Sequence, residues 1–218
     1  MSRAYLKFVQ TDYQDKNLNF TSDTASIYRF KMPIRGYGFC KVLPVVTANN
    51  DLLHLVHIYD YYGRYEINKD TLSKVLENDY LMSPIPMKLL PLNRGYGAWR
   101  ILGKIALNDE YIPDYKFTKE PLAECNSKIS EWYPLHDLHK KGKKACSYDT
   151  VKHLEHYHLY TPQEIEVRAA MEILKKEGSK IKLFFDLSYP DILDNYYRTI
   201  NMPLYTEIPD TIRGKALV

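Results

Sequence analysis

The stretch SIYRFKMPIRGYGFCKVLPVV, residues 26–46, decides the fold class of this chain. Within this stretch, the apolar side chains of Tyr28, Phe30 and Met32 alternate with the basic side chains of Arg29 and Lys31. That period is typical of a strand with one buried face. Pro33 and the two glycines of RGYG (residues 35–38) predict a turn, and FCKVLPVV (residues 39–46) is a second strand. We therefore predict a β-hairpin over residues 26–46.

The segment that follows predicts further strands and one helix. LLHLVHIY (residues 52–59) is a third strand, and KDTLSKVLEN (residues 69–78) places its leucines and valine on one helical stripe. A stretch with three prolines, residues 81–93, is expected to be extended. In the next strand, we expect Trp99 and Ile101 to point into the core between the sheet and the helix over 69–78.

The last third of the chain opens on a strong helix signal. TPQEIEVRAAMEILKKEG (residues 161–178) begins with a threonine N-cap, a proline at the first helical position and a glutamate that completes a capping box. Gly178 is the expected stop. KIKLFFDL (residues 180–187) is predicted as a strand, and YPDILDNYYRTI (residues 189–200) as a second helix.

These elements predict an α+β fold, in which a curved antiparallel sheet with a packed helix precedes a mixed helix and strand region. We divide the chain into an N-terminal arm (residues 1–25), an α+β domain (residues 26–118) and a C-terminal extension (residues 119–218). Two arrangements of the extension are open: it stands apart, or it packs on the first domain to make one.

Charge and cysteine content limit the compartment and the partners. The 218 residues include 30 Lys and Arg against 27 Asp and Glu, and a net charge of +3 indicates neither nucleic acid nor an acidic membrane. Three cysteines without a CxxC pair are typical of a reduced, cytosolic protein. The N-terminus lacks the apolar run of a secretory signal, and no stretch approaches the ~20 apolar residues of a membrane span. We expect a cytoplasmic protein with no membrane partner.

The candidate catalytic and metal-binding residues do not form a recognisable pattern. His153, His156 and His158 are the densest group, but structural zinc takes four ligands and no second Cys or His pair accompanies them. The motifs GxSxG, HExxH and GxxxxGK[ST] do not occur. Cys40 lies in the middle of a predicted strand, where a buried small apolar role is favoured over a nucleophile. We expect no metal, no cofactor and no enzymatic activity.

Tyrosine is unusually frequent, with 20 residues against 7 Phe and 2 Trp. Two interpretations are open, because tyrosine is enriched at protein interfaces and also fills the half-exposed faces of sheets. The basic run KKGKK (residues 140–144) with nearby tyrosines would suit nucleic acid through stacking and phosphate contacts. A solvated basic loop is favoured, because acidic residues are interleaved with the basic ones along the chain.

Residues 26–118 contain four short motifs: Gly36–Tyr37–Gly38, Ile58–Tyr59–Asp60, a strand running from Trp99 to Gly103, and Pro113–Tyr115. With these motifs the segment resembles the immunity protein 26 family of bacterial polymorphic-toxin systems. The resemblance implies a non-enzymatic protein that binds and neutralises a cognate toxin acting in the cytosol. The alternative is a nucleic-acid-associated or regulatory binding module. Residues 119–218 depart from the family pattern.

An interface of this kind should use aromatic and arginine side chains at strand ends, because buried Tyr, Trp and Arg anchors dominate protein contacts. The DYYGRY segment and the second RGYG turn supply such residues. The expected partner-binding residues are Tyr61, Tyr62, Arg64, Tyr65, Arg94 and Tyr96.

Overall fold

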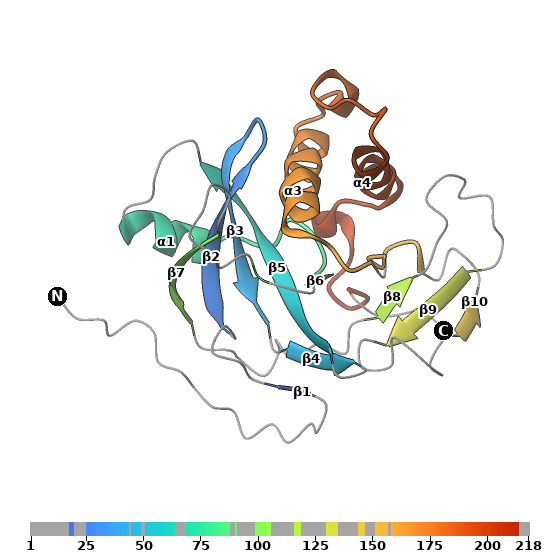
Figure 1. Cartoon of the computed structure of the whole chain (residues 1–218), viewed down its shortest axis with the longest axis horizontal. Coiled ribbons are helices and arrows are strands. Elements are labelled where there is room, and N and C mark those ends of the chain that lie inside the picture. Colours follow the sequence, from blue (N-terminus) through green and yellow to red (C-terminus); the bar gives the residue numbers. More distant parts are fainter. Residues whose placement is uncertain are drawn as a thin grey trace.

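The computed structural model describes residues 18–19, 25–43, 45–48, 51–63, 69–87, 90, 99–105, 116–118, 130–134, 144–146, 151–156 and 158–213. Within these residues the main sheet has seven antiparallel strands, which confirms the α+β class (Figure 1). Six follow one another across the sheet: β1 (Leu18–Asn19), β4 (Val45–Ala48), β5 (Asp51–Gly63), β3 (Gly36–Val42), β2 (Ser26–Met32) and β7 (Arg100–Lys104). The seventh, β6 (Ile85–Met87), pairs with β5.

A second, three-stranded antiparallel sheet contains β8 (Lys116–Thr118), β9 (Ser130–Pro134) and β10 (Lys144–Cys146). The remaining elements are α1 (Lys69–Leu76), α3 (Pro162–Lys176), α4 (Pro190–Asn201), and the 3₁₀ turns η3 (Ile181–Leu183) and η4 (Tyr205–Glu207). No helix in the part of the chain that is described has the length and apolar character to cross a membrane.

The predicted hairpin is present over β2 and β3, and its register runs from Ile27 opposite Lys41 to Met32 opposite Gly36. The single second strand predicted over residues 39–46 is wrong, because β3 ends at Val42 and residues 45–46 belong to β4, which pairs with β5. Gly36 has a φ of +84°, a conformation that side chains with a Cβ rarely adopt. Two residues later the backbone passes under the Phe30 ring, and a Cβ built on Gly38 would lie 2.7 Å from a ring carbon. The glycines of the first RGYG motif therefore serve the turn and the close packing behind it.

Alternating residues of β2 supply two cores, one on each face of the sheet. Tyr28 and Phe30 belong to the larger core, which also contains Ile165 and Ala169 of α3. Ile27 lies on the opposite face in a smaller core with Val75 of α1. Figure 1 shows α3 across one face of the sheet, and the larger core joins residues before and after position 119.

The helix signals in the last third are confirmed, whereas the strand predicted over residues 180–187 is wrong. Thr161 and Glu164 form the capping box of α3, and Gly178 ends it with a φ of +69°. Residues 181–183 form the 3₁₀ turn η3, because their backbone bonds are local: the N–H of Phe184 donates to the carbonyl of Ile181 at 2.9 Å. Only one side chain of this turn is buried, so no sheet is needed to cover it.

Trp99 is buried as expected, but it packs against a different helix. Its ring stacks on Phe30 with centroids 5.0 Å apart, and its Nε1–H donates to the Glu166 carboxylate of α3 at 3.0 Å. The expectation for Ile101 is wrong, because 55% of this residue is exposed. Ile101 lies opposite Tyr28 in β7, the last strand of the described sheet, where the surface is open on one side.

We predict that Trp99→Ala lowers the free energy of unfolding by about 3–5 kcal/mol, since it opens a cavity beside Phe30 and removes a hydrogen bond to α3. Ile101→Ala is the matched control and should change it by less than about 0.5 kcal/mol. Urea denaturation of both variants measures the difference, and equal losses would contradict the assigned packing.

Gly38→Ala should lower the free energy of unfolding by about 1–3 kcal/mol, because the new methyl group would collide with the Phe30 ring. Gly63→Ala is the control, since nothing lies within 4 Å of a Cβ at that position. Thermal unfolding followed by circular dichroism compares the two, and an unchanged Tm for Gly38→Ala would refute the close packing.

Candidate partner-binding surface

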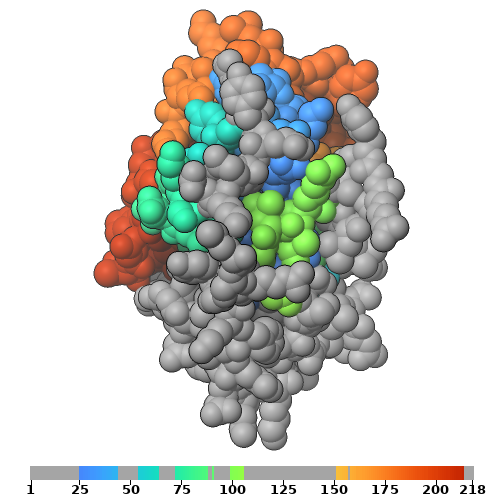
Figure 2. All heavy atoms as spheres, turned by 90° about the vertical axis from the view of Figure 1, so that its left-hand side faces the viewer, coloured from blue at the N-terminus to red at the C-terminus, as the bar shows by residue number. Residues whose placement is uncertain are grey.

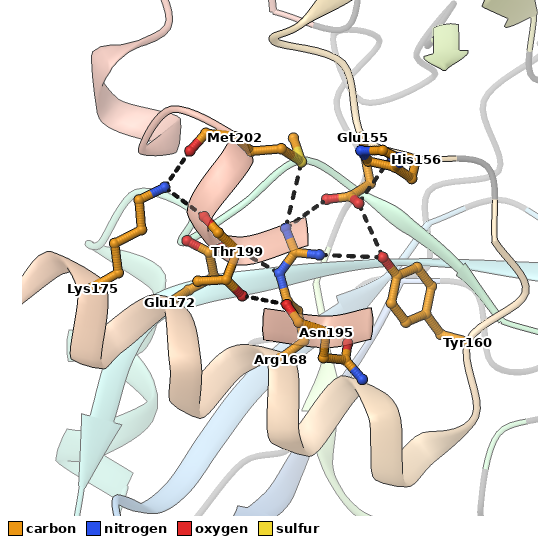
Figure 3. A network of polar contacts seen from close by, with 9 residues as sticks. All are labelled: Glu155, His156, Tyr160, Arg168, Glu172, Lys175, Asn195, Thr199 and Met202. Atoms are coloured by element: carbon orange, nitrogen blue, oxygen red, sulfur yellow. Dashed lines mark hydrogen bonds and ion pairs between the residues drawn. The ribbon is translucent and has the colours of Figure 1, made fainter. Parts of the chain in front are cut away.

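A cluster of charged residues beside α3 is buried in the described part of the chain. Arg168 of α3 is 1% exposed; its Nε–H donates to the Glu172 carboxylate at 3.0 Å (Figure 3). Its terminal nitrogens donate to the Glu155 carboxylate and the Tyr160 hydroxyl, each at 3.4 Å. The same face of α3 carries Lys175, whose ammonium donates to backbone carbonyls at the end of α4. The network thus ties Glu155, Tyr160 and α4 to one stripe of α3.

Electrostatic balance in this network depends on Arg168. Burial favours a raised carboxyl pKa, but Arg168 and His156 outweigh burial at Glu155 and hold the pKa of that carboxyl below its ordinary value. At Glu172 burial prevails and the pKa is raised. Burial also raises the pKa of Tyr160. Shifted pKa values are typical of active sites and equally of structural ion networks.

Access decides between these two roles. The cavity that touches Arg168 and Glu172 has a volume of about 10 Å³, room for about one water molecule. No organic substrate could enter such a space. We therefore interpret the network as part of the scaffold that holds α3 in place.

Cys40 and two of the three clustered histidines are also buried. His153 and His156 are buried, and His158 Nε2 lies 2.8 Å from the Glu164 carboxylate. In the described ranges, no three His, Cys, Asp or Glu side chains gather as metal ligands would. Cys40 is fully buried in the larger core, as expected, and burial raises the pKa of its thiol.

A different kind of cluster is exposed where the β2–β3 hairpin meets the end of α3. We call it the hairpin-end surface; its residues are Ile34, Arg35, Tyr62, Glu177 and Phe184. Figure 2 shows the blue hairpin atoms against the orange atoms at the end of α3. Three of these residues are large hydrophobic side chains exposed to between 38% and 47%. Exposed apolar side chains beside charged ones are a feature of protein-binding sites.

The turn at the hairpin tip is strained. Ile34 has a φ of +72°, and the N–H of Arg35 donates to the carbonyl of Pro33 at 2.8 Å. A γ-turn with positive φ at a β-branched residue is a costly conformation. It places the Ile34 side chain at the surface, 47% exposed. Such strain persists only where surrounding contacts hold it, and it is often found at functional sites.

The side chain of Glu177, just after α3, holds the surface together. Its carboxylate accepts hydrogen bonds from the Tyr62 hydroxyl at 2.6 Å and the Arg35 guanidinium at 2.5 Å. These bonds lower the pKa of Glu177, and the one with Tyr62 raises the pKa of the phenol. Beside them, Lys176 pairs with Asp60 of β5, and the Arg35 guanidinium lies 5.7 Å from the centroid of the Phe184 ring.

The expected partner-binding residues lie in different places in the structure. Tyr62 lies in this surface and is 38% exposed. Tyr61 points to the other face of the sheet, where it packs against the smaller core with its ring 5.7 Å from that of Phe39. The remaining four lie outside the described residues: Arg64, Tyr65, Arg94 and Tyr96.

Sequence reasoning missed Ile34, Arg35, Glu177 and Phe184. One signal pointed to Arg35, since it opens the first RGYG motif as Arg94 opens the second. The strand predicted over residues 180–187 includes Phe184, and a sheet at this position would bury its ring. Glu177 gains its role only through the fold, because 115 positions separate it from Tyr62.

Comparisons with known proteins identify no relative of this chain. No family model matches the sequence, no curated protein matches it, and no solved structure matches the fold. The immunity-family resemblance therefore stands on its short motifs alone.

We predict that Arg168→Met lowers the free energy of unfolding at pH 7 by about 3–5 kcal/mol, because Glu155 and Glu172 lose the buried guanidinium that pairs with both. The loss should shrink as the pH falls. In the native protein the lowered pKa of Glu155 gives stability above its unfolded pKa, which is lost on acidification. In the variant the unpaired Glu155 takes up a proton early and its penalty disappears.

Urea denaturation of both proteins between pH 7 and pH 4 measures this difference. Lys74→Met, on the exposed side of α1, is the control and should leave the pH profile unchanged. A gap between Arg168→Met and native protein that stays constant or widens toward pH 4 would contradict the assignment.

Proposed function

We propose that this protein is a non-enzymatic immunity protein that binds and neutralises a cognate bacterial toxin acting in the cytosol. The hairpin-end surface is the observation that carries the proposal. It combines exposed Ile34, Tyr62 and Phe184 with an arginine already paired to a carboxylate. Aromatic and arginine residues surrounded by polar groups are the usual anchors of protein interfaces.

The contacts at this surface favour binding because they fix the anchors before a partner arrives. Arg35 and Tyr62 are both bonded to Glu177, and the γ-turn fixes the backbone at Ile34. Side chains that are already ordered lose less conformational entropy when a complex forms. A partner would cover the apolar groups and leave the ion pairs at the rim.

The resemblance supports a toxin as the partner. Two of its four motifs lie near this surface along the chain: Gly36–Tyr37–Gly38 follows the hairpin tip, and Ile58–Tyr59–Asp60 ends two residues before Tyr62 in β5. Asp60 also holds Lys176 at the end of α3. The motif positions and the exposed anchors therefore meet in one region of the fold.

The test is co-expression with the toxin domain encoded by the neighbouring gene, followed by growth measurement and co-purification. Native protein should restore growth and form a one-to-one complex. The triple variant Arg35→Ala, Tyr62→Ala, Phe184→Ala should weaken the complex by at least about 100-fold, since each anchor is worth about 1–2 kcal/mol or more. Protection should be lost.

A matched triple variant, Leu76→Ala, Glu77→Ala, Ile101→Ala, removes exposed side chains elsewhere and should protect as the native protein does. Both variants should keep the native circular dichroism spectrum. Full protection by the Arg35, Tyr62, Phe184 variant would move the interface elsewhere. Native protein that neither binds nor protects would refute the immunity function, and salt-sensitive retention on DNA would then favour the nucleic-acid-associated alternative.

A further inference from the structure

A groove that adjoins the buried network at Lys175 lies between the end of α3, η3 and α4. Its volume is about 450 Å³, in the range of sites that accept side chains or small ligands. Figure 1 shows these three elements together, and their shared packing is formed by residues such as Leu174, Ile181 and Tyr196. The described lining is Lys175, Gly178, Ser179, Lys180, Ile181, Lys182, Leu183, Tyr196 and Ile200.

The charge of this lining is of one sign. Lys175, Lys180 and Lys182 line the groove, and none of the described lining residues has a carboxylate. The Lys175 ammonium is bound to the carbonyls of Thr199 and Met202, which leaves two lysines for a ligand. Both are exposed, and neither forms an ion pair within the described part of the chain.

The groove also has an apolar side. Leu183 of η3 is 76% exposed, the highest value among the large hydrophobic residues described, and Ile200 of α4 is 43% exposed. Ile200 and Tyr196 are four residues apart and so share one face of α4. An apolar group placed between Leu183 and Ile200 would remove both from water, which is favourable.

We infer that this groove binds an acidic segment of a partner protein, with one apolar side chain inserted between Leu183 and Ile200 and carboxylates on Lys180 and Lys182. The positive charge of the two lysines favours acidic residues in the ligand. The exposed apolar pair favours an apolar side chain between them. A lysine ammonium binds a carboxylate as a compact point charge and tolerates varied geometry, which suits a flexible peptide.

Two other polyanions fit the groove less well. Nucleic acid without sequence preference is held by stacking on aromatic faces, but the Lys182 ammonium already lies 5.4 Å from the centroid of the Tyr196 ring. A bilayer is flat on this scale, and a concave lining would leave its lysines out of contact with headgroups. A peptide is narrow enough to enter.

This site is independent of the proposed toxin contact, although the two are adjacent, since Leu183 and Phe184 are neighbours in sequence. A partner that covers Phe184 would reach the groove if one of its segments extended past Phe184. The test therefore uses peptides and no toxin, so that failure here leaves the proposed function to its own experiment.

The probe is a short fluorescein-labelled peptide in which Asp and Glu alternate with Leu, followed by fluorescence anisotropy on the full chain. We expect a Kd of about 100 μM or tighter. A second peptide with Gln in place of each Leu should bind at least about tenfold more weakly, and a third with Lys in place of each acid should not bind.

Lys180→Glu with Lys182→Glu should abolish binding, and Leu183→Ser should weaken it about tenfold or more. The matched controls are Lys74→Glu on α1 and Ile101→Ser on β7, which make the same kinds of change elsewhere and should bind as the native protein does. The Arg35, Tyr62, Phe184 triple variant should also bind the peptide normally.

Four results would overturn the inference. Three concern the peptides: no binding at about 1 mM, equally tight binding of the peptide with Gln in place of Leu, or binding that survives in the double lysine variant. The fourth is an oligonucleotide or phosphatidylserine vesicle that binds more tightly than the acidic peptide and no longer binds to the double lysine variant. Peptide binding by the double lysine variant would place the peptide outside the groove. Tighter binding of the oligonucleotide or vesicle would assign the groove to that ligand. A native Tm in each variant ensures that lost binding is not lost folding.

Discussion

Ile165 and Ala169 of α3 pack with Tyr28 and Phe30 of β2 in the larger core, and this contact holds the helix against the sheet. An alanine at the contact allows the helix to approach the sheet closely, and the large aromatic rings fill the space around it. The helix then cannot expose every charge that it carries, because its other faces meet α4 and the segment before it. Arg168 is buried as a consequence, and its stability requires the two carboxylates that surround it.

The start of α3 could be predicted from the sequence, because its signals are local. The burial of Arg168 could not. Thr161 and Glu164 lie within one turn of each other, so the capping box is visible in the sequence and the start of α3 follows from it. The burial of Arg168 is not visible, because an arginine between glutamates on a helix is typical of a solvated face. The prediction for Ile101 failed for a related reason: alternation shows which face of a sheet a residue occupies, but not where the covering helix ends.

The hairpin-end surface shows the same limit. Tyr62 could be predicted because aromatic residues at strand ends are common anchors, and its position follows from β5 alone. Glu177 could not, because its role exists only once α3 has packed beside β5 and the hairpin. Phe184 follows a 3₁₀ turn that the sequence favours as a strand, since polar and apolar residues alternate over the four positions 180–183. A short apolar run is ambiguous until its partners are known.

The strain at Ile34 connects these features. A γ-turn at a β-branched residue costs about 1–3 kcal/mol. The offset comes from Arg35, whose guanidinium binds Glu177 and lies beside Phe184 once the tip is bent toward α3. The packing of α3 thus positions the Glu177 carboxylate that holds the γ-turn. The γ-turn keeps Ile34 exposed beside Tyr62. Relaxing the turn would release Arg35 from Glu177, so the exposed apolar group and the ion pair beside it persist together or not at all.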